Sequence, residues 1–381
     1  MKVNVLQENL ARGLGIVSRA VSPRSTLPVL GNILMATDEG RLRLSATNLE
    51  LGITCWIGAK ILEEGSTTVP ARTFVDLVGT LSDKQVDMDL NVRTQTLNLR
   101  CGASNTDLKC IDAQEFPPMP VLDYSQGLQL NVADLKEMIQ QVVFAASTDD
   151  ARPILTGVLV TVTENLITMA AADGFRLSVR RASLSSPVPR PISAVIPARA
   201  LSELARIASD GDQSLTMVLP SGRGQVVFRL RDAELVSQLI EGAFPDYEQL
   251  IPRRCETRAV LSTAMFLKAC KQAEIFAREG SHIARISITP GGELQPGTVE
   301  ISGQSEETGS NQNLVDASIE GPALLIAFNV RFLREVLDVI KTPNVAVETT
   351  KDTSPGVIRP VGGQDGQGEF LHVIMPMHLG N

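Results

Sequence analysis

The phrase VPARTFVDLVG at residues 69–79 returns as IPARALSELAR at residues 196–206. An apolar residue, a proline, an alanine and an arginine recur in the same order, and apolar residues at helical spacing follow each time. A weaker third copy, IAFNVRFLREVLDVIKT, occupies residues 326–342. Successive copies lie about a third of the 381-residue chain apart, which is the pattern of an internal repeat. The sequence therefore predicts a repeated architecture.

A second phrase recurs with the same period and predicts the rest of each repeat. A short alternating strand, a turn and a helix are predicted at residues 3–21, 128–147 and 258–277. Stretches such as GRLRLSATNLELGI at residues 40–53 alternate apolar and polar residues, as antiparallel sheets with one buried face do. The predicted fold is α+β, and each repeat has antiparallel sheets and two helices. The three domains are predicted at residues 1–124, 125–252 and 253–381.

The composition limits the class of protein. The chain is 43% hydrophobic and 20% charged, which are globular values with enough apolar material for several cores. It contains no apolar run of the ~18 residues that a membrane helix needs, and its first residues lack the apolar stretch of a signal peptide. The five cysteines are odd in number and form no Cys-x-x-Cys pair, so a disulfide framework is not expected. We expect a cytoplasmic protein that does not enter a membrane.

Basic residues recur on helix faces that the apolar stripes leave free. In the first predicted helix Arg12 and Arg19 lie seven positions apart, and Arg199 and Arg206 repeat this spacing in the fourth. Such residues are most often ordinary solvated charges, and carboxylates lie among them. The candidate basic residues are Arg12, Arg19, Arg24, Arg72, Lys136, Arg199, Arg206, Lys268, Lys271, Arg331 and Arg334.

The overall charge of the chain is negative, unlike that of these helix faces. A net charge of −8 argues mildly against a simple nucleic-acid-binding protein. Net charge does not say where the charges lie, however. Six helices with basic faces turned toward one axis would give a positive lining inside an acidic body. Because phosphates attract Lys and Arg without regard to base sequence, such a lining would suit duplex DNA and permit sliding.

The residues alone reveal no catalytic or metal site. His282, His372 and His378 are not at the spacing of metal ligands. Asp149 and Asp150 are adjacent, and adjacent residues on a strand point to opposite faces. Ser and Cys residues have no base partner in a recognisable motif. We therefore expect a protein that is not an enzyme and has no metal or cofactor.

Five stretches, in order, resemble the beta subunit family of bacterial DNA polymerase III, the sliding clamps. They are TLPVLGNILM, TVPARTFVDL, AADGFRL, GAFPDYEQLIP and VIMPMHL, and the resemblance runs from Met1 to Leu379. It implies three similar domains per subunit and two subunits that close head to tail into a pseudo-sixfold ring. Sheets would lie outside, and helices would face a hole threaded by duplex DNA. The implied role is a non-catalytic processivity subunit in DNA replication.

The resemblance also implies a pocket for short peptide motifs, typically with a Gln and apolar or aromatic anchors, from polymerase and clamp-loader subunits. Unbranched methionines suit a surface that receives several partners. On residue types alone, the terminal run could equally be a strand packed in the core of the third domain. The implied pocket residues are Leu155, Gly174, Phe175, Arg176, Leu177, Pro245, Leu250, Val373, Ile374, Met375, Pro376, Met377 and Leu379.

Several positions depart from the family pattern. Phe175 stands where His is usual, and Pro153 and Ile154 stand where an aromatic pair is common. Gln249 replaces an Arg of some members, and the Gly-rich segment near Gly362 is longer than usual. These departures leave the peptide preference and the details of DNA contact open.

The resemblance joins the first domain of one subunit to the third domain of the other. Glu306 and Glu307 would face basic residues such as Lys109 across the joint. Exposed ion pairs contribute only about 0–1 kcal/mol each, so apolar contact and strand pairing are expected to dominate. The candidate interface residues are Leu108, Ile275, Phe276, Glu306 and Glu307.

Two other classes of protein fit part of the sequence. A repeat scaffold that binds peptides but not DNA would suit the acidic charge. A sequence-independent single-strand binder needs aromatic stacking platforms, and the aromatic content of 4% argues against it. The expected partners are duplex DNA, partner peptides and a second copy of the chain.

Overall fold

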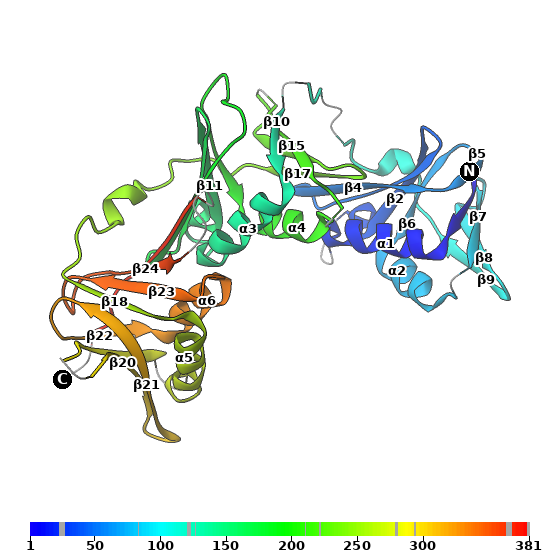
Figure 1. The fold of residues 1–381 in the computed structure, drawn as a ribbon. Coiled ribbons are helices and arrows are strands. Elements are labelled where there is room, and N and C mark those ends of the chain that lie inside the picture. The colour runs from blue at the N-terminus through cyan, green and yellow to red at the C-terminus, as the bar shows by residue number, and fades with distance from the viewer. Residues whose placement is uncertain are drawn as a thin grey trace. The chain divides into compact units, whose positions relative to one another are not determined.

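The computed structural model describes residues 1–22, 27–82, 84–119, 123–125, 127–209, 211–220, 222–278, 281–292, 295–362 and 368–378. Their contacts form two compact units (Figure 1). Unit 1 comprises Met1–Ala133 and Arg199–Leu239, and unit 2 comprises Asp134–Ala198 and Ile240–Asn381. Within the described residues there are six α-helices, two in each predicted repeat. None of these described helices is both long and apolar enough to cross a membrane.

Unit 1 contains two sheets with antiparallel pairing. The strand order of the first is β5 (Lys60–Glu63), β1 (Lys2–Leu6), β7 (Gln85–Asn91), β8 (Thr96–Cys101), β9 (Ser104–Lys109). The order of the second is β10 (Leu128–Asn131), β15 (Ser214–Val218), β16 (Gln225–Arg229), β17 (Ala233–Gln238), β4 (Leu51–Gly58), β3 (Arg41–Thr47), β2 (Asn32–Asp38), β6 (Ser66–Pro70). The helices assigned to this unit are α1 (Gln7–Val17), α2 (Ala71–Thr80) and α4 (Ala198–Ile207).

Unit 2 contains one long antiparallel sheet of twelve described strands. Its order is β14 (Ile192–Pro197), β11 (Gly157–Thr163), β12 (Leu166–Ala172), β13 (Arg176–Ser183), β25 (Glu369–Ile374), β24 (Gly356–Val361), β23 (Asn344–Thr349), β18 (Thr257–Ser262), β21 (Gly309–Glu320), β20 (Gly297–Ser305), β19 (Ile283–Thr289), β22 (Leu324–Asn329). The helices are α5 (Thr263–Ala277), α6 (Val330–Val339) and almost all of α3 (Val132–Val142).

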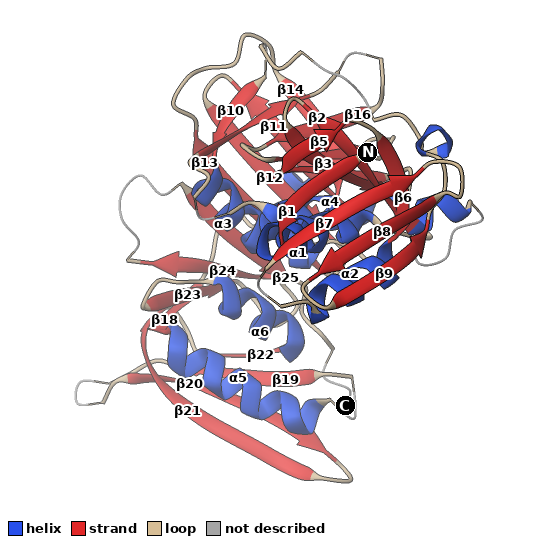
Figure 2. Cartoon of the chain, turned by 90° about the vertical axis from the view of Figure 1, so that its right-hand side faces the viewer, coloured by secondary structure: helices blue, strands red, loops and turns tan. Residues whose placement is uncertain are grey.

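Helices α5 and α6 lie side by side against this sheet (Figure 2). Phe266, Cys270, Ala273 and Ala277 form the buried stripe of α5 at helical spacing. Because most of these side chains are small, the helix approaches β20 closely. A Cβ atom on Gly303 would lie 2.3 Å from the carbonyl oxygen of Ala273, so glycine is required there. This packing forms the main core of unit 2.

The predicted first helix extends less far than its pattern indicated. Leu10, Leu14 and Val17 form a buried stripe at helical spacing, but α1 ends at Val17. A 3₁₀ turn, Ser18–Ala20, follows, so Arg19 lies on this turn instead of the α-helix. The apolar spacing continues to Val21 by coincidence, because spacing in sequence does not detect the change from α to 3₁₀ hydrogen bonding.

Strand pairs that are distant in sequence hold the repeats together. In unit 1, β17 pairs with β4, and Ala233 is the register partner of Cys55. In unit 2, β25 pairs with β13, and Leu177 is the partner of Val373. Each pair joins the last strand of one repeat to the fourth strand of the preceding repeat. The chain therefore contains the same kind of strand pair twice, and each such pair between repeats is called a joint below.

A buried histidine lies within the second of these joints. His372 on β25 is fully buried, and its Nδ1 lies 2.6 Å from the hydroxyl of its register partner Ser178. Burial, together with the charge of Arg176, lowers the pKa of His372 well below its usual value. The folded protein therefore keeps this imidazole neutral, whereas the unfolded chain protonates it below pH ~6.5.

We expect His372 to make the protein less stable in mild acid. Because only the unfolded state takes up this proton, the free energy of unfolding falls by about 1.4 kcal/mol between pH 7.5 and 5.5 from this residue. Urea unfolding followed by circular dichroism at both pH values measures the fall. The variant His372→Gln should show a smaller fall by that amount, since its other titrating groups are unchanged. Equal falls in the two proteins would contradict the assignment.

Candidate functional site

Three of the predicted basic residues come together in unit 1. Arg19 and Arg206 both pair with the carboxylate of Glu203, at 3.2 and 2.8 Å. Arg199 donates a 3.5 Å hydrogen bond to the backbone carbonyl of Arg19. Arg12 is also exposed in this unit. Two arginines share one carboxylate and Arg199 adds a third cation beside them, so these residues carry a net positive charge next to α4.

The basic residues of α5 and α6 are more closely balanced by acids. Lys271 pairs with Asp338 at 2.9 Å, and Arg334 pairs with Glu274 at 2.8 Å. Arg331 pairs with Glu335 at 2.8 Å. The carboxylates that lie among the basic residues in the sequence are thus their partners in space. The side chains of Lys271 and Arg331 are 50% and 57% exposed, so pairing leaves part of each cation open to solvent.

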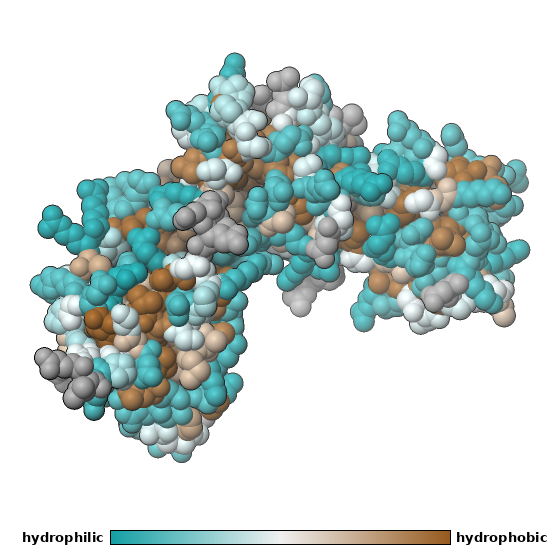
Figure 3. All heavy atoms as spheres, in the orientation of Figure 1, coloured by the Kyte–Doolittle hydropathy of each residue, from teal (hydrophilic) through white to brown (hydrophobic). Residues whose placement is uncertain are grey.

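The remaining basic candidates are placed separately. Arg72 on α2 and Lys268 on α5 are exposed, and Lys136 on α3 is half-buried. Arg24 lies outside the described residues. In the view of Figure 3 the surface of each unit is mostly hydrophilic, with smaller hydrophobic patches on each.

The residues predicted to form the peptide pocket divide between two faces of the joint of β13 and β25. Leu177 and Val373 belong to one buried cluster, which also contains Tyr247. Their neighbours Arg176 and Ile374 are partners in register and point to the opposite face. Ile374 is packed in the core with α5 and α6. Treating the terminal run as one continuous surface is therefore a mistake, because side chains alternate along a strand.

The exposed members of the set surround the end of this joint. Phe175 is 62% exposed, Met375 is 42% exposed, and the backbone N–H of Met375 donates to the carbonyl of Phe175 over 2.9 Å. Leu250 and Pro245 are also exposed, in the segment that places Tyr247 in the buried cluster. Apolar side chains thus reach solvent directly above the buried pair Leu177 and Val373.

The other members have more structural positions. Leu155 is buried on a 3₁₀ turn, Pro153–Thr156. Gly174 has a φ of +94°, which favours glycine at the turn before β13. Pro376 and Met377 are half-buried, and the N–H of Met377 donates to the carbonyl of Ala327 over 2.8 Å. Leu379 and residues 363–367 of the Gly-rich segment lie outside the described part of the chain.

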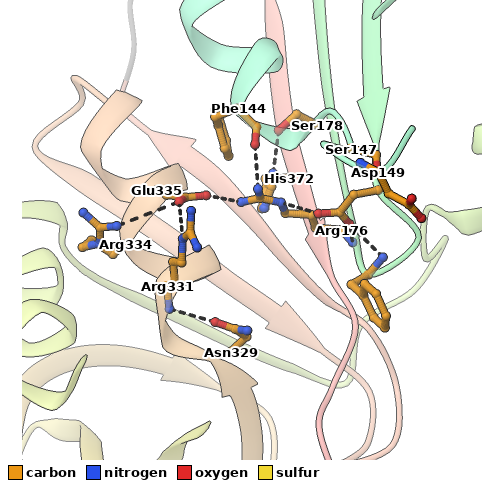
Figure 4. A network of polar contacts seen from close by, with 12 residues as sticks. Phe144, Ser147, Asp149, Arg176, Ser178, Asn329, Arg331, Arg334, Glu335 and His372 are labelled. Atoms are coloured by element: carbon orange, nitrogen blue, oxygen red, sulfur yellow. Dashed lines mark hydrogen bonds and ion pairs between the residues drawn. The ribbon is translucent and has the colours of Figure 1, made fainter. Parts of the chain in front are cut away.

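Arg176 is the most strongly held residue of the set (Figure 4). Its side chain is 7% exposed and forms an ion pair with Asp173 at 2.9 Å and another with Glu335. It also donates to the carbonyl of Phe144 over 2.6 Å, and its guanidinium lies 4.3 Å from the ring centroid of Phe332. Arg176 is thus a buried support behind the exposed apolar residues and not part of their surface.

Glu335 is the acidic partner on α6. Burial alone would raise the pKa of this carboxyl, but hydrogen bonds from Arg176 and Arg331 outweigh burial and lower it. Sequence reasoning missed Glu335, Phe144 and Phe332. The motif Asp-Gly-Phe-Arg at residues 173–176 gave only a local signal, because Asp173 also accepts hydrogen bonds from the N–H groups of Phe175 and Arg176. The other partners are distant in sequence.

The predicted interface residues lie in three places, on α5, in the turn between β20 and β21, and on β9. Ile275 on α5 is 56% exposed, and Phe276 is half-buried. Glu306 and Glu307 are exposed in the turn between β20 and β21. Leu108 on β9 is already buried within unit 1, so its side chain has little surface left to offer a partner. The sequence did not single out Leu314 on β21, which is 63% exposed.

Metal chemistry gains no support from the described residues, which contain no group of three or more His, Cys, Asp or Glu side chains arranged to hold a metal ion.

Three family matches cover nearly the whole chain. Residues 1–120 match the N-terminal domain of the DNA polymerase III beta subunit, residues 129–246 its central domain, and residues 248–378 its C-terminal domain. These matches support three domains, while the boundaries after residues 124 and 252 stay predictions.

Curated relatives and solved structures agree with the family matches. The chain is 33% identical to the beta sliding clamp of Synechococcus elongatus over the full length of both, and 32% identical to that of Staphylococcus epidermidis over 94% of this chain and 96% of the relative. The crystal structure of the Bacillus subtilis DNA polymerase sliding clamp, 29% identical, matches with a TM-score of 0.91 over 100% of this chain and 99% of its own. A sliding clamp of Pseudomonas aeruginosa bound to griselimycin, 27% identical, matches with a TM-score of 0.90 over both whole chains. The chain belongs to the DNA polymerase III beta subunit family, the family of the beta sliding clamps.

Proposed function

We propose that two copies of this chain close head to tail into a ring around duplex DNA and tether DNA polymerase to it. The observation that supports the ring most is the joint that is used twice, β17 with β4 and β25 with β13. By repeat position, β9 corresponds to β17 and β25, and β21 corresponds to β4 and β13. The third joint would therefore pair β9 of one copy with β21 of the other.

Both of these strands have an unpaired edge among the described residues. β9 is the last strand of its sheet and pairs only with β8. β21 pairs with β20 from Gly309 to Ala317, but with β18 only from Ala317 to Glu320. The other edge of β21 is thus open over its first residues, where Leu314 is exposed. Open edges are templates for pairing with another chain.

The basic surfaces described above would contact the phosphates of the enclosed duplex, independent of sequence. The exposed apolar residues above Leu177 and Val373 would receive peptide motifs of polymerase and clamp-loader subunits, with methionine adapting to different anchors. The role is that of a non-catalytic processivity subunit, and we place it in the cytoplasm with the replication machinery.

The ring predicts topological retention on DNA. Loaded by its cognate clamp loader with ATP, the protein should stay on closed circular duplex through gel filtration in moderate salt. It should leave the same DNA after one restriction cut, because a ring slides off an end. Retention on the linear product would exclude sliding, and failure to associate with duplex in any form would leave the peptide scaffold as the better assignment.

The variant Asp107→Pro tests the strand joint within this experiment. Cys110 donates its N–H inward to Gln95, so alternation turns the N–H of Asp107 outward, away from β8. Of the backbone groups proline removes only that outward donor, and the carboxylate contact with Asn98 is lost in the alanine control as well. We expect a shift from dimer to monomer in analytical ultracentrifugation and loss of retention on circular DNA. The control Asp107→Ala keeps the N–H and should remain a retained dimer; identical behaviour of both variants would contradict the joint.

Neutralising Arg199 and Arg206 together should weaken binding to a linear duplex at low salt. Each lost phosphate contact lowers the slope of log affinity against log salt by about 0.9, so the double variant should lose up to about 1.8. Fluorescence anisotropy of a labelled duplex in a salt series measures this slope. The control changes two exposed arginines of hairpin turns, Arg93→Ala with Arg231→Ala, and should keep the native slope. An equal loss of slope in the control would mean that the duplex responds to the total charge of the protein and not to Arg199 and Arg206 in particular.

Met375→Ser and Leu250→Ser should weaken peptide binding. Both side chains are exposed, so each substitution removes apolar contact without unfolding the protein. We expect the Kd of a labelled hexapeptide with one Gln and with Leu and Phe anchors to rise about ten-fold, which corresponds to about 1.4 kcal/mol. Leu166→Ser, at a similarly exposed leucine on β12, is the control. Unchanged affinity in the first two variants would place the pocket elsewhere.

A further inference from the structure

A continuous set of contacts within unit 2 links the proposed peptide site to the proposed DNA-facing helix. Met375 is hydrogen-bonded to the carbonyl of Phe175, and Arg176 is the next residue along β13. Arg176 pairs with Glu335 on α6, which also pairs with Arg331. Figure 4 shows these side chains pointing toward one another from the strand and from the helix.

Three guanidinium groups compete for the carboxylate of Glu335. Its Oε2 accepts from Arg176, while Oε1 accepts from Nε of Arg331 at 2.8 Å and lies 3.9 Å from Nη2 of Arg334. The side chain of Glu335 is only 18% exposed, so these attractions are screened less than surface pairs. Arg334 has further acceptors in Glu274 and Asp338. Of the three carboxylates that pair with Arg334, Glu335 is the one that also pairs with Arg176.

Asp173 connects the side chain of Arg176 to the turn that presents Phe175. Asp173 binds the side chain of Arg176 through Oδ2 and the N–H groups of Phe175 and Arg176 through Oδ1. The rings of Phe144 and Phe332 lie against the guanidinium, with centroids 5.5 and 4.3 Å away. A change in how firmly Glu335 holds Arg176 therefore changes how well the turn is fixed before a peptide arrives.

Phosphate groups on α6 would redistribute these contacts. Arg331 is exposed, and Arg334 is half-buried on the same helix. A phosphate that attracts them away from Oε1 leaves the carboxylate to Arg176 alone. The pair of Arg176 and Glu335 then becomes stronger, and the turn at Phe175 becomes more fixed.

We propose that Glu335 is a positioning residue for the peptide site and that, through it, duplex DNA on Arg331 and Arg334 increases the affinity for partner peptides. The inference rests on the proposed function and deepens it, because it makes the peptide site sensitive to whether the ring holds DNA. By reciprocity, a bound peptide raises the affinity for DNA by the same factor. Partners would thus bind preferentially to clamps that are already on DNA.

The experiment measures the Kd of the labelled hexapeptide for the full-length protein, with and without a saturating unlabelled duplex at constant low ionic strength. A separately labelled duplex reports DNA binding. For the native protein we expect duplex to lower the peptide Kd about two- to ten-fold. Glu335→Gln should weaken peptide binding and abolish the response to duplex, and Glu335→Asp should restore part of both. Glu348→Gln, which removes a similarly buried carboxylate that pairs with Arg258 and Arg359, should respond as the native protein does.

Weaker peptide binding by Glu335→Gln could also result from misfolding, so a second variant is chosen that should bind the peptide more tightly. Arg331→Ala with Arg334→Ala should bind the peptide more tightly than the native protein without DNA, and duplex should add nothing. Circular dichroism melting checks that each variant is folded. If duplex and peptide both bind but do not affect each other, or if the double variant binds peptide no better, the inference is wrong while the proposed function stands. If the duplex binds none of the proteins, both fail.

Discussion

Main-chain pairing between strands from different repeats is the constraint on which the rest of this structure depends. Each repeat ends in a strand that must bury its N–H and C=O groups against a neighbour, and β17 and β25 do so on β4 and β13. A chain of three such units satisfies two joints internally and leaves one edge of each kind, on β9 and β21. The proposed ring is the arrangement in which these last two edges pair with each other.

The basic residues on the helices also share their partners. The chain is acidic overall, at −8, yet its helices place arginines beside single carboxylates such as Glu203 and Glu335. Each of these carboxylates is shared by at least two arginines, so the cations are only partly neutralised, and the exposed ones can turn to phosphate. A surface of this kind attracts DNA modestly and without reading bases, which is compatible with movement along the duplex.

Arg176 shows how packing converts a sequence motif into a different role. By resemblance it belongs to the peptide pocket, but the structure buries its guanidinium between two aromatic rings and two carboxylates. A buried arginine needs such partners, because an unpaired charge there would be strongly destabilising. The exposed surface above it consists of Phe175, Met375 and Leu250, whose preference for particular peptides rests on shape and flexibility instead of charge.

The sequence by itself determined the elements. Helical spacing predicted the buried faces of α1, α4 and α6, and period-two alternation predicted antiparallel strands, because both depend only on side-chain direction along a local backbone. The repeat, read together with the five motifs, led to the family. Only the tertiary structure decided that α1 ends at Val17, that Ile374 faces the core, and that Glu335 holds Arg176. These depend on which distant strands pair and in what register, and a one-residue shift in register exchanges the two faces of a strand, so no local pattern encodes them.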